Sequence, residues 1–453
     1  MSSGSSSSAV PRAGLPAPSG LWRDRDFRRL WLGQAASQLG EQTSLVVLPL
    51  VAVLTLGADP GRLGVLRAVG QAPVLLLSLF AGAWVDRSRT RTVMMLTDAG
   101  RALALGGAAL AGLLGGLGLP ALLLVTFATG SLSVYFDVAY QASLVRLVRR
   151  DQLVRGNSAL EGCRSAAQIG GPALGGALVS LLQAPAGTAC SAAFFVLSFV
   201  SIGRIRRREV IPPAPRVTSA PLVTSAPPVP SATKNLARPM RVWSRIHQGL
   251  RCVARDSRLR AVGLASGAFQ FSFAAVMTVY LLFLPRELHL SGAAVGLALA
   301  ATGPGALLGS VLAARLPGRY GHGAVLVCAA LLGDGALLCV PSLHSPAPMT
   351  MAVLLAVNFV FGTCGQLVNV TVMALRQAVT PEGMQGRVSA TITFAGMGLA
   401  PLGSLLGGCV AEQWGLRTGL LVAVTGMLAS PALMALSPLA RVGRTLPGPR
   451  VPG

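Results

Sequence analysis

About twelve long apolar runs make up most of this chain, and its charged residues fall mainly in the gaps between them. Most of the runs reach the ~20 residues with which a helix crosses ~30 Å of hydrocarbon. The alternation therefore predicts an all-α membrane protein with twelve transmembrane helices. The runs are 31–56, 63–85, 93–114, 118–140, 161–182, 186–203, 260–284, 292–314, 322–341, 348–375, 387–411 and 416–437.

Arginines are distributed unevenly between the even and the odd gaps. Cytoplasmic loops carry an excess of Lys and Arg, so the asymmetry indicates that the even gaps are cytoplasmic. An even number of spans then places both termini in the cytoplasm. The second, fourth, eighth and tenth gaps hold Arg87, Arg89, Arg91, Arg146, Arg149, Arg150, Arg155, Arg315, Arg319, Arg376 and Arg387, whereas the odd gaps hold Arg62, Arg286 and Arg417.

The composition excludes several classes of protein. Hydrophobic residues make up 52% of the 453 positions and charged residues 12%, which is too apolar for a soluble protein. The net charge of +23 lies largely in membrane-flanking arginines, so a nucleic-acid partner is not expected. The single lysine, Lys234, follows no glycine-rich loop, which excludes a P-loop ATPase. The cysteines and histidines form no ligand cluster, and neither a metal nor another cofactor is expected.

The chain is predicted to divide into two six-helix bundles. Residues 21–203 form the first and 259–440 the second, with a cytoplasmic linker at 204–258 between them. The linker contains a Pro- and Ser-rich stretch and an amphipathic basic helix, which either lies on the membrane surface or simply tethers the halves. The tails, 1–20 and 441–453, are predicted to be cytoplasmic, the first of them a disordered segment and not a signal peptide.

The two halves carry an internal echo. A charged turn and a helix start lead to Pro172 and Gly175 in the first half, and to Pro401 and Gly403 in the second. Two related bundles joined by a cytoplasmic linker are a transporter architecture, in which the substrate lies between halves that rock about it.

The gap after the second span reads GAWVDRSRTR, from Gly82 to Arg91. It resembles the loop signature of the major facilitator superfamily, G-x-x-x-D-R-x-x-R-R, with a threonine in place of one basic residue. Gly82 permits close helix approach, and Asp86, followed by Arg87, is suited to latch a cytoplasmic gate. A plain Arg-rich loop is the alternative, and it explains the arginines but not Gly82 together with Asp86.

The fifth span carries the run GPALGG, which contains Gly171, Pro172, Gly175 and Gly176. It resembles the core of the superfamily's antiporter motif, although Ala167 stands where an earlier glycine is usual. Small residues permit tight packing and proline frees a backbone carbonyl, so the segment is suited to a pliable hinge. Ordinary small-residue packing is the alternative. The resemblance favours export over uptake.

Other stretches are similar to a narrower branch of the superfamily. They are FRRLWLGQ and SQLGE between Phe27 and Glu41, FDVAYQ from Phe136, and GRVS from Gly386. Together they resemble the enterobactin-exporter-like and macrolide-efflux-like proteins over about 21–440. The resemblance implies proton-coupled efflux of amphipathic small molecules such as siderophores or drugs. The fourth span departs from it, because it lacks the embedded arginine of the superfamily's second motif.

Ionisable groups at bilayer depth are costly and therefore mark functional sites. Glu41, about ten residues into the first span, is the first candidate for proton coupling. Gln34 and Gln38 share its helix face and are expected to line a polar cavity with it. The alternative is a glutamate that locks helices against an arginine. Asp334 and Asp137 are the further coupling candidates, although the helix of Asp334 is expected to lie away from the central cavity.

Other charged residues are assigned to structure. Asp98 and Arg101, three positions apart in the third span, are expected to pair with each other or with the loop. Arg164 either pairs with Glu161 or contacts a substrate anion, and Arg67 is placed to snorkel.

Polar residues in the seventh and tenth spans are candidates for lining the substrate cavity. They are Gln270, Asn358, Gln366 and Asn369. Helix–helix hydrogen bonding is an equally good interpretation of each of them.

The sequence thus predicts a monomeric secondary transporter, and not an enzyme, in the inner membrane of a bacterium. Its expected partners are a small-molecule substrate, protons and the lipid bilayer. Proton-coupled efflux is the leading interpretation. An uptake carrier or facilitator for a small solute or lysolipid is the alternative on the same fold, and a non-transporting sensor or scaffold is the alternative from another class.

Overall fold

The computed structural model describes residues 21–85, 88–147, 152–205, 251, 253–344, 348–380 and 385–445. Every regular element in these ranges is a helix. Nine helical stretches in the described residues are long and apolar enough to cross a membrane. The prediction of an all-α membrane protein is therefore confirmed. Asp86, Arg87, most of the linker and both distal tails lie outside the described residues, as do the surroundings of Gly82.

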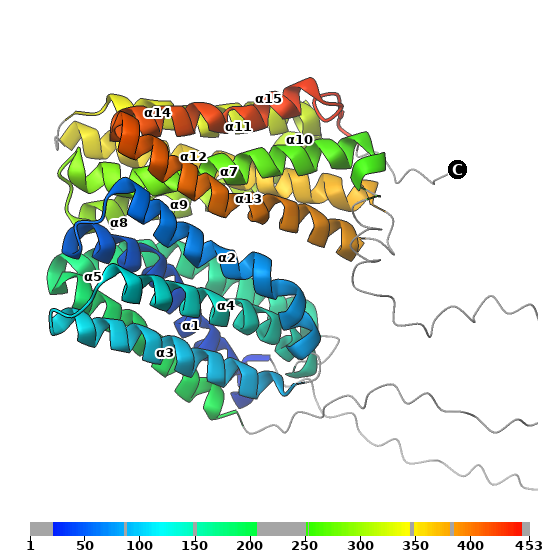
Figure 1. The fold of residues 1–453 in the computed structure, drawn as a ribbon. Coiled ribbons are helices and arrows are strands. Elements are labelled where there is room, and N and C mark those ends of the chain that lie inside the picture. Colours follow the sequence, from blue (N-terminus) through cyan, green and yellow to red (C-terminus); the bar gives the residue numbers. More distant parts are fainter. Residues whose placement is uncertain are drawn as a thin grey trace, which may run out of the picture.

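Figure 1 shows the helices gathered into two bundles, one from each half of the chain. The first bundle contains α1 (Arg25–Leu50, continued by η2, Val51–Thr55), α2 (Pro60–Val85), α3 (Thr90–Leu113), α4 (Leu119–Leu147) and α5 (Leu153–Gly203). The second contains α7 (Ser257–Arg286), α8 (Gly292–Ala300), α9 (Thr302–Ala313), α10 (Leu316–Tyr320), α11 (His322–Ala336, continued by η4, Leu337–Ser342), α12 (Pro348–Val379), α13 (Gln385–Trp414), α14 (Leu416–Met427) and α15 (Ala429–Leu436).

Among the described residues, five turns with positive φ lie at one end of the molecule, which we call the hairpin end; the opposite end, where the described chain begins and finishes, is the tail end (Figure 1). The turns are centred on Gly57, Gly115, Gln183, His289 and Gly415. Apart from Gly115, their numbers form two pairs with the same spacing of 232 positions (289 − 57 and 415 − 183). The two halves therefore repeat each other with a register of 232 residues.

Gln183 divides α5 into two antiparallel arms. Its backbone, at φ 68° and ψ 163°, is not helical, and the chain reverses there, so that a Cβ on Gly187 would lie 3.6 Å from the backbone nitrogen of Val179. Gly415 makes the same break between α13 and α14. With α5 counted as two arms, the helices agree with six passes in each half. The count of twelve stays an interpretation, because α2 and α13 are not among the nine membrane-length stretches.

The same register recurs at the tail end. Asp24 caps α1 by accepting from the backbone N–H of Asp26 at 2.9 Å, and Asp256 caps α7 by accepting from that of Arg258 at 2.8 Å. An aspartate side chain satisfies amide groups that have no partner within the helix. The caps are again 232 residues apart, so the counterpart of Pro172 is Ser404. The pairing of Pro172 with Pro401 suggested by the sequence is therefore wrong by three residues.

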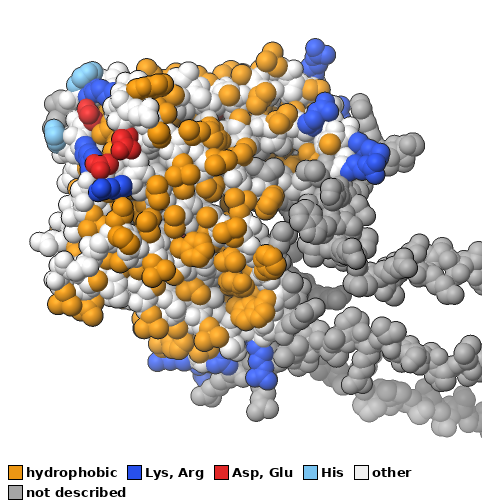
Figure 2. All heavy atoms as spheres, in the orientation of Figure 1, with side chains coloured by type: hydrophobic (Ala, Val, Ile, Leu, Met, Phe, Trp, Pro, Cys, Tyr) orange, Lys and Arg blue, Asp and Glu red, His pale blue; other side chains and the backbone are white. Residues whose placement is uncertain are grey.

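The surface between the two ends is apolar. Figure 2 shows hydrophobic side chains spread over this surface, with the acidic and basic side chains gathered near its edges. Large side chains such as Leu103, Leu181 and Leu436 are between 77% and 89% exposed. A soluble protein rarely exposes so large a contiguous apolar area, whereas a bilayer covers one.

Candidate functional site

Arg101 of α3 lies fully buried at the centre of the first bundle. Its Nη2 donates to Asp98 Oδ1 at 2.5 Å and to Ser37 Oγ at 3.0 Å, and its Nη1 donates to Ser133 Oγ at 3.1 Å. Ser198 donates to the other carboxylate oxygen of Asp98 at 2.5 Å. The partners come from α1, α3, α4 and the second arm of α5, so this cluster joins four passes of the first bundle.

Two aromatic rings and a second carboxylate complete the surroundings of Arg101. Phe136 and Phe195 lie over its guanidinium, each with the ring centroid 4.4 Å from Cζ, a geometry that stabilises a cation. Glu41 of α1 places Oε2 3.7 Å from Nη1 of Arg101. The side chain of Glu41 is 22% exposed, whereas those of Arg101 and Asp98 are inaccessible.

This arrangement has one positive charge for two carboxyl groups. A net negative charge in a desolvated site is costly, so the neutral form of the cluster carries one added proton. Asp98 is enclosed by Arg101 and two serine hydroxyls, while Glu41 reaches the accessible surface. Glu41 is therefore the member of this trio that water can reach.

Asp137 of α4 extends the cluster toward the accessible side. It interacts electrostatically with Glu41, Arg101 and Arg164, and its side chain is exposed. Arg164 also lies 3.9 Å from Glu161, with both side chains about half exposed. Two of the predicted coupling residues, Glu41 and Asp137, are thus brought together, whereas Asp334 lies in the other bundle.

The pairing of Asp98 with Arg101 was predicted from the sequence and is confirmed. The alternative interpretation of Glu41, a glutamate against an arginine, agrees with its contact with Arg101, although the sequence did not identify which arginine. The fourth span lacks the embedded arginine of the superfamily's second motif, and Arg101 of the third span lies at a comparable depth. The sequence feature that marked this cluster was an aspartate and an arginine three positions apart within an apolar run. Gln34 and Gln38 were expected to line a cavity with Glu41. Both are buried, at 1% and 5% exposed, on the packed face of α1 and do not open to an accessible surface.

The glycines of the fifth span form two contact faces on α5. A Cβ on Gly171 would strike Gln42, and one on Gly175 would come within 3.0 Å of the carbonyl oxygen of Thr43, both on α1. A Cβ on Gly176 would instead strike Gly292 and lie 2.7 Å from Cα of Gly296, in the second bundle. The motif thus permits close packing both within the first bundle and between the bundles.

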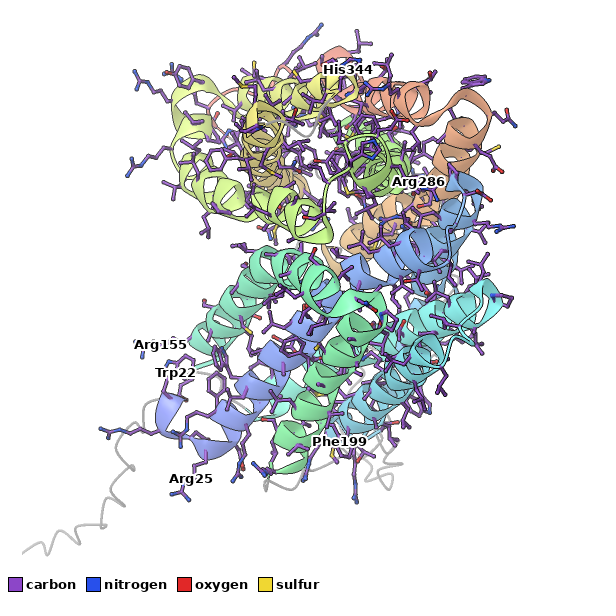
Figure 3. The ribbon with its side chains drawn as sticks, turned by 90° about the vertical axis from the view of Figure 1, so that its left-hand side faces the viewer. Trp22, Arg25, Arg155, Phe199, Arg286 and His344 are labelled. Carbon is purple, nitrogen blue, oxygen red and sulfur yellow. The ribbon has the colours of Figure 1, made fainter. Side chains whose placement is uncertain are left out.

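The bundles meet chiefly along two helix pairs, α5 with α8 and α2 with α13 (Figure 3). In the second pair a Cβ on Gly408 would lie 3.1 Å from Cα of Gly64. Both contacts lie toward the hairpin end, and 232 residues separate Gly176 from Gly408 and Gly64 from Gly296. The junction is therefore symmetric.

Hydrogen bonds cross the same junction. The backbone N–H of Ala293, in the first turn of α8, donates to Ser180 Oγ at 2.6 Å. Arg286 donates to the carbonyl oxygen of Ala58 at 2.8 Å, and Gln71 donates to Ser404 at 3.3 Å. These bonds hold the hairpin ends of the two halves together in this structure.

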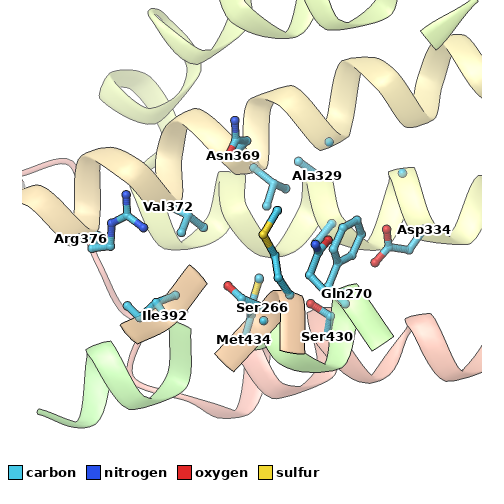
Figure 4. Close-up of a pocket in the computed structure, with 17 residues that line it drawn as sticks. Ser266, Gln270, Ala329, Asp334, Asn369, Val372, Arg376, Ile392, Ser430 and Met434 are labelled. Carbon is cyan, nitrogen blue, oxygen red and sulfur yellow. The ribbon is translucent and has the colours of Figure 1, made fainter. Parts of the chain in front are cut away.

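A cavity of about 320 Å³ lies within the second bundle (Figure 4). Three of the predicted site residues, Gln270, Asn369 and Asp334, line it together. Two others do not: Asn358 is buried and donates to the hydroxyl of Tyr280 at 2.7 Å, and Gln366 packs beside Gly309. The remaining lining residues are Ser266, Phe269, Ala329, Ala330, Gly333, Gly365, Val368, Val372, Arg376, Ile392, Gly396, Met397, Ser430 and Met434.

Arg91 is the part of the predicted gating motif whose contacts the structure describes. Its Nη2 donates to the carbonyl oxygen of Gly203, at the last turn of α5. A cation at a helix C-terminus is favourably placed for the helix dipole. Arg91 therefore joins α3 to α5 within the first bundle.

Comparison with known proteins identifies relatives over most of the chain. A family model described as the Major Facilitator Superfamily matches residues 30–398 and, separately, 262–451. The chain is 27% identical over 439 residues to a protein named multidrug efflux pump Tap from Mycobacterium tuberculosis (strain ATCC 25618 / H37Rv), with 89% of this chain and 94% of the relative covered. A protein of the same name from Mycolicibacterium fortuitum is 24% identical over 374 residues, covering 80% and 84%.

Solved structures share the fold. A variant of the nucleoside transporter NupG matches with a TM-score of 0.69 and 13% identity, covering 90% of this chain and 99% of that one. A bacterial homologue of the iron transporter ferroportin, in an inward-facing state, also matches with a TM-score of 0.69, at 16% identity, covering 90% and 98%. At these identities the likeness concerns the arrangement of helices alone.

Proposed function

The chain belongs to the Major Facilitator Superfamily, and we propose on that basis that it exports amphipathic small molecules in exchange for protons. The relatives named multidrug efflux pump, which align over most of the chain, support export of drug-like compounds. The distribution of arginines supports an orientation with the tail end and both termini in the cytoplasm. The bacterial relatives support a location in the inner membrane of a bacterium.

The cluster around Arg101 is the observation that carries the proposal. It offers two carboxyl groups for one guanidinium, and only Glu41 of the three reaches the accessible surface. Binding and release of one proton at Glu41 then change the net charge of a site that joins four helices. Such a change favours one arrangement of the bundle over another, which is what coupling requires.

The junction at the hairpin end supports alternating access. With the tail end in the cytoplasm, the contacts of Gly176 with Gly296 and of Gly64 with Gly408 close the outer side. Transport requires a second state in which these contacts separate and the tail ends approach each other. The predicted latch at Asp86 would then belong to that second state.

The test is the substitution Glu41→Gln, which resembles the protonated side chain. Everted membrane vesicles containing the full chain would be given an imposed pH gradient and the dye ethidium. The wild-type chain is expected to accumulate the dye and to dissipate the gradient. Glu41→Gln should retain dye exchange without a gradient and lose accumulation against one.

Asp59→Asn is the control, because Asp59 is an exposed carboxylate that pairs with Arg62 at the hairpin end, away from Arg101. It should accumulate the dye as the wild type does. If Glu41→Gln still concentrates the dye at matched protein levels, the proton site lies elsewhere.

A further inference from the structure

Asp334 of α11 is a buried carboxylate, and no other described residue forms an ion pair with it. Its side chain lies at one end of the cavity in the second bundle (Figure 4), and the residue is only 4% exposed. One carboxylate oxygen, Oδ2, has no hydrogen-bond partner. Among the described residues no basic nitrogen lies within 4.0 Å of either oxygen. A carboxylate in this position is costly unless a positive group or a proton accompanies it.

The 232-residue register explains where the cavity comes from. The counterpart of Arg101, which fills the centre of the first bundle, is Gly333. The counterparts of three groups around Arg101, namely Ser37, Ser133 and Phe136, are Phe269, Gly365 and Val368. All four counterparts line the cavity.

The cavity therefore occupies the place that the guanidinium of Arg101 occupies in the first bundle. Asp334 follows Gly333 directly, so a carboxylate lies beside the place of the missing guanidinium. It is not the counterpart of Asp98, whose position in the second bundle is taken by Ala330. Two further pairs keep polar side chains in register, Gln38 with Gln270 and Ser198 with Ser430. The second bundle thus has a carboxylate and polar side chains at this place, and among the described residues no cation lies beside the carboxylate.

We propose that this cavity binds an organic cation, with its guanidinium or ammonium group against Asp334. The volume of about 320 Å³ is far larger than an inorganic ion and suits a small organic molecule. Gln270 and Asn369 offer amide oxygens to N–H groups. Phe269 offers an aromatic ring at the same site, which stabilises a cation.

Arg376 does not serve as the missing counter-ion. It lies at the other end of the cavity (Figure 4). Gly365 of α12 lies near the end of the cavity that Asp334 occupies. Arg376 lies eleven positions further along the same helix, which corresponds to roughly 16 Å of helix rise. The cavity is therefore negative at one end and positive at the other, and it orients a cationic molecule with its charge toward Asp334.

That the bound cation is a transported substrate rests on the proposed export function. Binding itself can be tested without measuring transport. Isothermal titration calorimetry would be carried out on the full chain in lipid nanodiscs. The probes are 2-phenylethylguanidinium and 2-phenylethylurea, which share a shape and differ in charge. Asp334→Asn should weaken binding of the guanidinium roughly 10-fold or more and leave binding of the urea unchanged.

Asp59→Asn is the matched control, because Asp59 is an exposed carboxylate at the hairpin end; it should bind both probes as the wild type does. Val372→Tyr places in the cavity the side chain that the first bundle has at the corresponding position, Tyr140. It should weaken binding of both probes, and thermal unfolding would verify that each variant is folded.

Three results would overturn the proposal. In the first, Asp334→Asn binds the guanidinium as tightly as the wild type does. In the second, Asp334→Asn weakens binding of the urea as much as binding of the guanidinium. In the third, Na⁺ displaces the guanidinium from the wild type but not from Asp334→Asn, so that the site binds Na⁺ itself. The Glu41→Gln variant should bind the guanidinium as the wild type does. Retained binding with lost accumulation would separate this site from the coupling site, so each proposal can fail without the other.

Discussion

A side-chain carbon on Gly176 of α5 would lie only 2.7 Å from the Cα of Gly296 on α8. The two helices thus touch through their backbones, across the junction between the bundles. Gly408 and Gly64 repeat the relationship on the symmetric helix pair. Close contact of this kind depends on the absence of side chains, and it makes the junction sensitive to a single methyl group.

Gly176→Ala should therefore separate the hairpin ends. Overpacking costs about 1–3 kcal/mol, which is enough to shift a two-state equilibrium several-fold toward the separated state. Double electron–electron resonance would measure the distance between spin labels at positions 116 and 344, which lie in loops of the first and the second bundle. This distance should be longer in Gly176→Ala. Gly170→Ala is the control, since a Cβ there meets nothing within 4 Å. An unchanged distance distribution in Gly176→Ala would show that the junction tolerates the methyl group.

Removing Arg101 should destabilise the first bundle. Arg101→Leu leaves Asp98 buried without its cation, and breaking such a pair costs about 3–5 kcal/mol. The double substitution Arg101→Leu with Asp98→Leu removes both charges and should recover much of that loss. The wild type, the two single variants and the double variant form a double-mutant cycle, and thermal unfolding in detergent measures the stability of each. Additive losses in the double variant would mean that the two residues act independently.

Gln183→Gly should raise the melting temperature. Gln183 adopts φ 68° and ψ 163°, a backbone region that side chains disfavour by about 1–3 kcal/mol. Its counterpart in the second half is already a glycine, Gly415. Gln168→Gly, in the exposed helical part of the first arm of α5, should instead lower the melting temperature. A loss of stability in Gln183→Gly would show that its side chain outweighs the strain.

Asp86→Asn should strongly reduce transport while leaving membrane insertion intact. The expectation comes from the loop signature, in which a charged aspartate latches the tail end. Transport by reconstituted protein at matched levels is the measurement, with Asp59→Asn as the control. Equal rates for wild type and Asp86→Asn would remove the latch role.

Hydropathy predicted the helices well because a bilayer forces each apolar run to satisfy its own backbone. Their ends differ from the predicted runs by several residues in places, as in α4, which continues seven residues beyond 140. Polar residues near the tail end extend a helix that hydropathy alone would stop. The charge pattern also drew attention to Glu41, because a glutamate within an apolar run is unusual, and the structure places this residue beside Arg101.

The partners of these residues could not be predicted, because periodicity does not tell which helix faces meet. The arginine beside Glu41 lies sixty positions away. The helix of Asp334 was expected to lie away from the central cavity, and that expectation did not reveal the separate cavity within the second bundle. The 232-residue register was hidden as well. It rests on a few glycines, two caps and four turns, while most of the paired positions carry different side chains.

The bond from Ala293 to Ser180 has a consequence for α8. The first amides of a helix have no partner within it, and here one of them is satisfied by a residue of the opposite bundle. Each time the bundles part at this end, the amide of Ala293 loses its partner, while Ser291 still caps the amide of Ala294. The backbone is therefore expected to begin to fray at Ala293. Deuterium uptake by the amides at the start of α8 would then count how often the molecule opens, without any label on either half.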